Sequence, residues 1–476
     1  MDKKTALVWY RRDLRMADNP ALVEAARLGL AVVPVFIWAP EEEGDWAPGG
    51  AARVWLHESL KSLQMTLKER GLTLLIKKGP SLETLLRTAK ECGAEAVFWN
   101  RCYEPALIER DKAVKAELQA KKIEAKSFSA SLLFEPWEIK TQQGTPYKVF
   151  TPFWNQLLAK PEISKPLEEP KLKPAASAGN GLKIEALELL PSIPWDKGIR
   201  KAWTPGESRA LQALEKFSSG PVNAYETGRD RPDETGTSRL SPHLHFGEIS
   251  PRQIWHALRK NKKGLVYLRQ IAWREFAYHL LYHFPHTPRD CMRPEFRAFP
   301  WERNARLLKA WQKGGTGYPI VDAGMRELWA TGWMHNRVRM IAASFLVKDL
   351  LVRWQEGAAW FWDTLVDADL ANNTLGWQWV GGCGADAAPY FRIFNPVSQG
   401  KKFDPQGVYV RRWVPELAGL DDKWIHEPWK APAEVLEKAG VKLGRDYPEP
   451  GVDHEAARRR ALMAYEKIKS GKNQTR

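Results

Sequence analysis

The chain has 476 residues, 44% of them apolar and 27% charged, a composition typical of a globular protein with two or three domains. No segment approaches the roughly 20 apolar residues of a membrane span, and the N-terminus lacks a signal-peptide core. Four scattered cysteines exclude a disulfide framework and a zinc site, so we expect a cytoplasmic protein without a metal. The net charge of +15 and the pI near 9.5 favour a polyanionic partner, with nucleic acid the first candidate.

The N-terminal part alternates short apolar segments with segments of helical spacing that end in glycine. The predicted strands lie at 6–10, 31–38, 72–78, 94–100 and 126–134. This alternation predicts an α/β domain over residues 1–135 with a parallel, five-stranded, Rossmann-like sheet. The first strand is followed by RRDLR and not by GxGxxG, which argues against a plain dinucleotide-dependent dehydrogenase.

The remainder of the chain divides into a connector and a helical part. Residues 136–205 are rich in Pro, Lys and Ala and predict an interdomain linker that crosses the surface. Residues 206–476 have mainly helical spacing and predict a large all-α C-terminal domain. Within it, Ser250, Pro251 and Gln253 have the spacing of a capping box at the start of a helix.

Tryptophans and polar side chains are concentrated between Thr331 and Pro396, in a chain that has 23 tryptophans. Buried indoles need apolar packing, whereas buried Asp, Arg and Asn need partners. A segment with both kinds of side chain therefore predicts a site for a flat ligand rich in heteroatoms. Asn336 and Met340 lie four residues apart in this segment and share a helix face.

Two earlier segments add candidate residues. Gln270, Trp273 and Arg274 stand at i, i+3 and i+4 of a predicted helix and share one face. The hydroxyl-rich loop at 237–241 offers side-chain hydroxyls and backbone N–H groups that could bind phosphate.

Five segments of the chain closely resemble the photolyase/cryptochrome family, and within it class I cyclobutane pyrimidine dimer photolyases. They are WYRRDLRMADNPAL, TSRLSPHLHFGEISPRQ, WREF, TGYPIVDAGMRELWATGWMHNRVRM and DADLANNTLGWQWVGGCGADAAPYFRIFNP. The resemblance extends from about residue 5 to 465. It implies an α/β antenna-binding domain, a linker and a helical domain that binds FAD. It also implies light-driven repair of UV-damaged DNA, in which excited reduced FAD lends an electron to a flipped-out dimer.

The resemblance implies which residues contact FAD. Contacts to the phosphates and the ribityl chain fall at Tyr225, Thr237, Ser238, Arg239, Leu240 and Ser241. Residues lining the flavin fall at Arg274, Asp367 and Asp369, with Arg339 paired to Asp367. Asn373 falls near flavin N5, where a neutral amide in place of an acid is expected to favour a neutral radical and the fully reduced anionic flavin.

The resemblance also implies a lesion pocket and an electron-transfer chain. Trp273 and Trp379 would stack on the flipped bases, Asn336, Met340 and Gln270 would contact the dimer, and Arg337 would hold a phosphate. Trp377, Trp354 and Trp301 match the chain that carries electrons to the flavin. Many relatives have Glu where this chain has Gln270, and because Gln cannot supply a proton, less efficient repair is expected.

Some points stay open. Asn100 and Glu104 correspond to the family's antenna pocket, but Cys291 is shifted and not followed by the Lys of folate-binding relatives. Folate, a deazaflavin, a second flavin or no antenna are all compatible with the sequence. The alternatives to dimer repair are a cryptochrome-type blue-light photoreceptor, a single-strand-specific relative and a (6-4) photolyase, which would have histidines in place of Asn336 and Met340. We expect a monomer without an obligate protein partner.

Overall fold

The computed structural model describes residues 4–160, 162–176, 179–390 and 392–471. Its internal contacts divide it into two compact units, each assembled from several chain segments. Unit 1 comprises Met1–Gly220, Ser238–Pro285 and Val366–Ala371, and unit 2 comprises Pro221–Thr237, His286–Leu365 and Asn372–Arg476. The domain boundaries expected at residues 135 and 205 stay a prediction. Each unit is built from several chain segments, so its limits are not the two ends of one continuous stretch.

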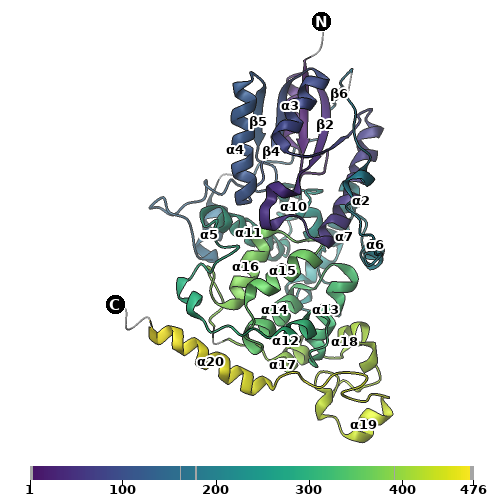
Figure 1. Cartoon of the computed structure of the whole chain (residues 1–476), viewed down its shortest axis with the longest axis vertical. Coiled ribbons are helices and arrows are strands. Elements are labelled where there is room, and N and C mark those ends of the chain that lie inside the picture. The colour runs from purple at the N-terminus through teal and green to yellow at the C-terminus, as the bar shows by residue number, and fades with distance from the viewer. Residues whose placement is uncertain (1–3, 161, 177–178, 391, 472–476) are drawn as a thin grey trace. The chain divides into compact units, whose positions relative to one another are not determined.

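Unit 1 is built on a parallel sheet with the strand order β3-β2-β1-β4-β5 (Figure 1). The strands are β1 (Thr5–Tyr10), β2 (Ala31–Trp38), β3 (Leu75–Lys78), β4 (Ala94–Asn100), β5 (Glu124–Phe128) and β6 (Lys173–Pro174). The five-stranded order confirms the predicted sheet. The two-residue β6, which pairs with Ala31 and Val32 of β2, was not predicted, because Lys-Pro has no strand pattern.

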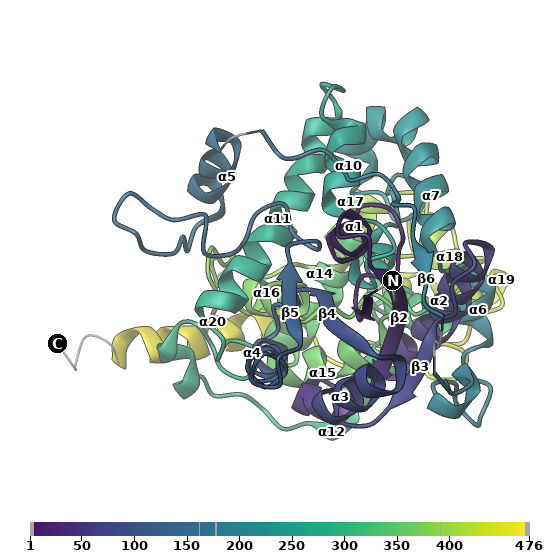
Figure 2. The same ribbon diagram turned by 90° about the horizontal axis from the view of Figure 1, so that it is seen from above.

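Four helices alternate with these strands. They are α1 (Pro20–Arg27), α2 (Gly50–Glu69), α3 (Ser81–Cys92) and α4 (Pro105–Ala120). Helix α1 covers one face of the sheet, and α3 and α4 cover the other (Figure 2). The strands are rich in Val, Leu and Trp because both faces are buried, and Leu7, Trp9 and Val97 are fully inaccessible to solvent.

Two predicted strands are shorter than expected. The strand predicted at 72–78 begins at Leu75, because Gly71 has φ = 73° and the amide of Leu72 bonds to the carbonyl of Leu67 at the end of α2. The strand predicted at 126–134 ends at Phe128, because side chains of a later helix bind the following backbone. The amide of Leu133 donates to Glu275 at 2.7 Å, and Arg274 donates to the carbonyl of Ser131 at 2.7 Å.

The rest of unit 1 is helical. Its helices are η1 (Pro40–Trp46), α5 (Phe150–Ala159), η2 (Ile184–Leu187), α6 (Lys197–Ala202), α7 (Glu207–Ser219), α9 (Ser241–His245), α10 (Pro251–Leu258) and α11 (Gly264–His283). The predicted capping box is confirmed. The backbone N–H of Gln253 donates to Ser250 Oγ, and the backbone N–H of Ser250 donates to Gln253 Oε1. Helix α5, in the predicted linker, is fixed by the ring of Phe150, which stacks on Trp273 at 3.8 Å.

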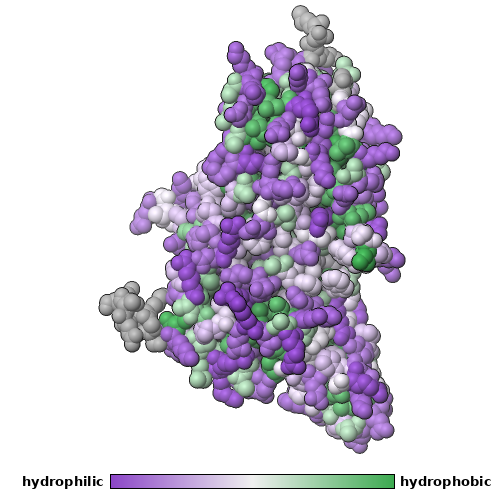
Figure 3. All heavy atoms as spheres, viewed as in Figure 1, coloured by the Kyte–Doolittle hydropathy of each residue, from purple (hydrophilic) through white to green (hydrophobic). Residues whose placement is uncertain are grey.

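The described residues of unit 2 form helices and loops, with one isolated bridge between Leu443 and Tyr447. Its main helices are α8 (Tyr225–Gly228), α12 (Ala305–Gln312), α13 (Pro319–Thr331), α14 (Asn336–Ser344), the π-helical turn η5 (Phe345–Asp349), α15 (Trp354–Thr364), most of α16 (Leu370–Gly381), α17 (Pro396–Phe403), α18 (Val408–Trp413), α19 (Ala433–Lys438) and α20 (His454–Gly471). Within the described residues, no helix is long and apolar enough to cross a membrane. Hydrophilic residues predominate on the face drawn in Figure 3.

Candidate functional site

The predicted site residues are distributed over both units. Unit 1 contains Asn100, Glu104, Ser238, Arg239, Leu240, Ser241, Gln270, Trp273, Arg274, Asp367 and Asp369. Unit 2 contains Tyr225, Thr237, Trp301, Asn336, Arg337, Arg339, Met340, Trp354, Asn373, Trp377 and Trp379. The expected ion pair between Arg339 and Asp367 would join the two units and stays a prediction.

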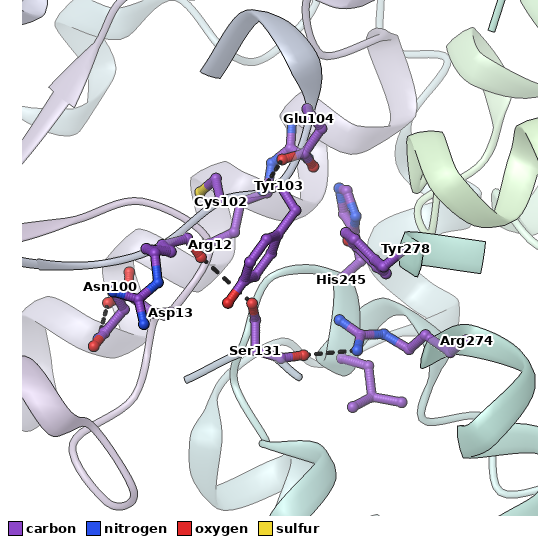
Figure 4. Close-up of a pocket in the computed structure, with 12 residues that line it drawn as sticks. Arg12, Asp13, Asn100, Cys102, Tyr103, Glu104, Ser131, His245, Arg274 and Tyr278 are labelled. Carbon is purple, nitrogen blue, oxygen red and sulfur yellow. Dashed lines mark hydrogen bonds and ion pairs between the residues drawn. The ribbon is translucent and has the colours of Figure 1, made fainter. Parts of the chain in front are cut away.

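A pocket in unit 1 lies where β1 and β4 end (Figure 4). The strand order reverses between these neighbouring strands, and ligands of open α/β sheets bind outside the carboxyl ends of the strands at such a point. Arg12 and Asp13 follow β1, and Asn100 to Glu104 end and follow β4. The cavity has a volume of about 10 Å³, which is room for one water molecule.

The two residues expected in the antenna pocket lie in this place and are both engaged by neighbours. The amide of Asn100 donates to Asp13 at 2.6 Å and to Asn19 at 2.7 Å. Glu104 forms an ion pair with Arg12, which also binds Glu43 at 2.5 Å. A chromophore placed here would therefore have to displace part of this network.

Three residues that line the same pocket, His245, Arg274 and Tyr278, form a buried charged cluster with Asp369. The phenol of Tyr278 donates to Asp369, the guanidinium of Arg274 lies 4.8 Å from the Tyr278 ring centre, and His245 lies 3.8 Å from Asp369. Although burial raises it, contacts with His245, Arg274 and Tyr278 hold the pKa of Asp369 well below its usual range. The cluster thus keeps a carboxylate anionic inside the protein.

Glu275, next to Arg274 on α11, behaves in the opposite way. Burial raises its pKa to about 7, although Arg274 at 3.5 Å and the amides of Leu133 and Phe134 favour the charged form. By accepting from these two amides, the Glu275 side chain links α11 to the segment that follows β5.

The hydroxyl loop of unit 1 is held in a defined conformation. Ser238 Oγ lies 2.7 Å from the hydroxyl of Tyr267 and accepts a bond from the amide of Leu240. Arg239 has φ = 54°, a conformation that non-glycine residues rarely adopt, and its guanidinium lies 4.2 Å above the ring of Trp203. A strained residue beside hydroxyls and backbone amides is consistent with a phosphate-binding loop.

In unit 2 two glycines that precede this loop in the chain lie very close together. A Cβ on Gly236 would overlap the backbone of Gly228, so only glycine allows the approach that brings α8 beside the start of the loop. Tyr225 opens α8 and is buried, and burial raises the pKa of its phenol to about 12. The phenol therefore stays protonated at neutral pH and can donate a hydrogen bond.

Two of the expected lesion contacts lie side by side on α14. The amide of exposed Asn336 donates to the sulfur of Met340 at 3.8 Å. Arg337, between them in sequence, pairs with Asp230 at 2.7 Å and lies 4.5 Å above the ring of Phe403. Its predicted phosphate contact would compete with this internal ion pair.

Two residues expected near the flavin are oriented by backbone carbonyls of unit 2. The amide of Asn373, on α16, donates to the carbonyl of Ala358 at 3.1 Å. Arg339 donates to the carbonyl of Met334 at 2.7 Å, with its guanidinium 5.9 Å from the Trp333 ring centre.

The three tryptophans of the predicted electron-transfer chain differ in exposure. Trp377 and Trp354 are buried and Trp301 is half-buried, and their role in electron transfer stays a prediction. A Cβ on Gly357 would overlap the ring of Trp377, so α15 approaches this ring as closely as its backbone allows. Trp301 contacts Phe299 at 4.4 Å.

The remaining expected lesion residues are half-buried. Phe150 covers one face of Trp273, which leaves base stacking to its other face. The Gln270 amide makes only a 3.5 Å contact to the carbonyl of Val266 on its own helix. The carbonyl of Trp379 accepts from the amides of Gly382 and Ala388 where α16 ends.

Comparison with known proteins decides the family. Residues 6–171 match the family model of DNA photolyase, and residues 267–467 match the FAD binding domain of DNA photolyase. The chain is 48% identical to a deoxyribodipyrimidine photo-lyase of Agrobacterium fabrum, over 98% of this chain and 99% of that protein. The chain belongs to the photolyase/cryptochrome family.

Two further members of the photolyase/cryptochrome family refine this placement. A crystal structure of a bacterial class III photolyase from Agrobacterium tumefaciens is 47% identical, with a TM-score of 0.95 and coverage of 99% of this chain and 98% of that one. The expected resemblance to class I is therefore not confirmed. Cryptochrome-1 of Arabidopsis thaliana is 42% identical over 95% of this chain and 69% of that protein.

As a member of this family the chain contains an FAD-binding domain, and FAD is its cofactor. Each unit, taken by itself, has residues whose chemistry fits part of such a group. The Ser238 loop and the close approach of Gly228 and Gly236 suit a phosphate chain, and the anionic Asp369 beside Arg274 suits a polar heterocycle. Phe391, in the last of the family's motifs, lies outside the described residues.

Several partners of the site residues were missed from the sequence. Tyr278 stands four residues after Arg274 on α11, so helical spacing could have revealed it. Asp230 and Tyr267, which bind Arg337 and Ser238, are distant in sequence from their partners, and no sequence pattern indicates these contacts.

Proposed function

We propose that this protein repairs cyclobutane pyrimidine dimers in UV-damaged DNA under blue light, as a class III photolyase that acts as a monomer. The observation that carries the proposal is the pair of Asn336 and Met340 on α14, an amide beside a soft thioether at an accessible surface. An amide can donate to a pyrimidine carbonyl and a thioether can pack on the cyclobutane ring. A (6-4) photolyase would have histidines at both places.

The residues of this protein would have separate roles in binding FAD and in binding the damaged bases. When bound, reduced FAD supplies the electron that light sends to the dimer. Ser238, Tyr225 and neighbouring backbone amides would bind its phosphates, and Arg274 with Asp369 would orient its ring system. Trp273 and Trp379 would stack on the extruded bases, a step that costs a few kcal/mol and less at a damaged site.

The proposal includes a route that keeps FAD reduced. Electrons would pass inward from half-buried Trp301 to the two buried indoles, first Trp354 and then Trp377. The three indoles then act as electron donors, and an external reductant at the surface returns an electron to Trp301.

The antenna residues Asn100 and Glu104 stay part of the proposal. They lie at the carboxyl end of β4, where the sheet changes strand order and ligands commonly bind. Absorbance of the purified protein between the near-ultraviolet and the blue would identify a folate, deazaflavin or second flavin. An Arg12→Ala change, which breaks the pair with Glu104, should alter the content of such a chromophore and not of FAD.

A cryptochrome-type photoreceptor is the second candidate, because the chain is 42% identical to a protein named Cryptochrome-1. One assay separates the two functions. Purified, photoreduced protein is illuminated with an oligonucleotide containing one thymine dimer, and a (6-4) substrate is treated in parallel. Repair of the dimer alone is expected, and it should fall in Asn336→Ala but persist in Met340→Leu, which keeps the volume. An FAD-loaded protein that repairs neither substrate would favour the photoreceptor.

A further inference from the structure

A thiol contacts the middle tryptophan of the proposed electron-transfer chain. The indole N–H of Trp354 donates to Sγ of Cys291 over 3.4 Å. Trp354 is 1% exposed and Cys291 4%, so water does not compete for this bond. Cys291 Sγ is therefore the hydrogen-bond acceptor for the indole N–H of Trp354.

Cys291 is itself held in place by a second thiol and by its backbone. Hydrogen bonding from Cys383, which is also buried, is the largest influence on Cys291 and lowers the pKa of its thiol despite burial. The side chain of Gln378 donates to the carbonyls of Thr287 and Asp290 and accepts from the amide of Met292. These bonds fix the segment around Cys291 against the end of α16.

A hydrogen-bond acceptor matters most when an indole loses an electron. The positive charge then spreads over the ring and makes the N–H a stronger donor, so a bond to the acceptor stabilises the oxidised form more than the neutral form. In a dry interior this difference is larger than in water. Without an acceptor, the buried N–H would be left unpaired in both states.

We propose that Cys291 is a positioning residue for electron transfer, whose sulfur orients the indole of Trp354 and stabilises the charge that this indole carries in transit. This inference rests on the proposed function, in which Trp354 gives one electron to Trp377 and regains one from Trp301. No covalent bond forms or breaks, and the proton stays on the indole nitrogen.

The test compares four variants of the FAD-loaded protein. Cys291→Ala removes the acceptor, Cys291→Ser replaces it with a hydroxyl oxygen, Trp354→Phe removes the indole, and Cys92→Ala controls for the loss of a thiol elsewhere. The rate of flavin photoreduction is measured with an external thiol reductant. Nitrogen-15 NMR of the tryptophan side chains, with the Trp354 signal assigned from Trp354→Phe, reports the N–H bond in the dark.

We expect Cys291→Ala to photoreduce about three- to tenfold more slowly and to shift the Trp354 N–H signal, as the loss of one hydrogen bond to a neutral acceptor predicts. Cys291→Ser should recover most of the rate, and Cys92→Ala should match the wild type. If Trp354→Phe is slow but Cys291→Ala is as fast as the wild type, the role of Cys291 is overturned while the chain stands. If Trp354→Phe is itself fast, the proposed chain fails and this inference fails with it.

Discussion

The phenol of Tyr278 donates a hydrogen bond to the carboxylate of Asp369 from a helix position one turn after Arg274. One buried phenol thus contacts both an anion and, through its ring face, a cation. The arrangement fixes Asp369 and Arg274 before any ligand arrives. Pre-organisation of this kind reduces the cost of ordering side chains on binding.

Removing the phenol should weaken FAD binding. Tyr278→Phe deletes a hydrogen bond to a charged group, worth about 1.5–3 kcal/mol, and leaves Asp369 with fewer partners. We expect a lower FAD content after purification and faster loss of FAD on dilution, measured by the flavin-to-protein absorbance ratio. Tyr282→Phe, one turn further along α11, is the matched control and should retain FAD.

Glu275 should make stability depend on pH. Its folded-state pKa of about 7 exceeds the ordinary 4.5, so between these values the folded state binds more protons and stability falls as pH rises. The loss reaches about 3 kcal/mol at pH 8. Thermal unfolding of Glu275→Gln should show a flatter profile from pH 5 to 8, since an amide oxygen can still accept from Leu133. A variant with the wild-type pH profile would contradict this assignment.

Asn373 should set the redox behaviour of the flavin. The amide donates to the carbonyl of Ala358, a bond that an ionised Asp cannot make. Asn373→Asp places a negative charge near the expected position of N5 and should disfavour the fully reduced anionic flavin. Spectroelectrochemical titration of this variant beside Asn372→Asp, the adjacent control, checks the prediction. Unaltered redox behaviour of Asn373→Asp would rule out the role.

Arg337 should contribute to DNA binding in a salt-dependent way. If it contacts one phosphate, Arg337→Gln lowers the slope of log K against log salt by about 0.9 for duplex DNA. Asp230→Asn removes the competing ion pair and should strengthen binding. Fluorescence anisotropy with a dimer-containing duplex from low to moderate salt measures both effects. Arg326→Gln, which breaks a similar pair with Glu416, should leave the slope unchanged.

The sequence predicted the sheet well because both faces of its strands are buried and their apolar segments are continuous. It failed where distant side chains decide the backbone. The segment after Phe128 reads as strand, but Glu275 and Arg274 bind its amides and carbonyls and draw it out of the sheet. Strand β6 depends on pairing with Ala31, which no local pattern indicates.

The candidate site followed from family motifs, whereas its supporting contacts did not. The positions of Arg274 and Asn373 within the family motifs predict their place beside the flavin, and this stays a prediction. The partners Asp230, Ala358 and Cys291 act through contacts set by the fold, so the structure was needed to find them.

The missing side chain at Gly357 makes this position a molecular ruler. A series from Gly to Ala, Ser and Val would force the Trp377 ring away from α15 in steps of one heavy atom. In the proposed electron-transfer chain, tunnelling weakens steeply with separation, so such a series would lower the rate of flavin photoreduction in steps that follow side-chain size. Position 357 would then set how fast light activates the protein.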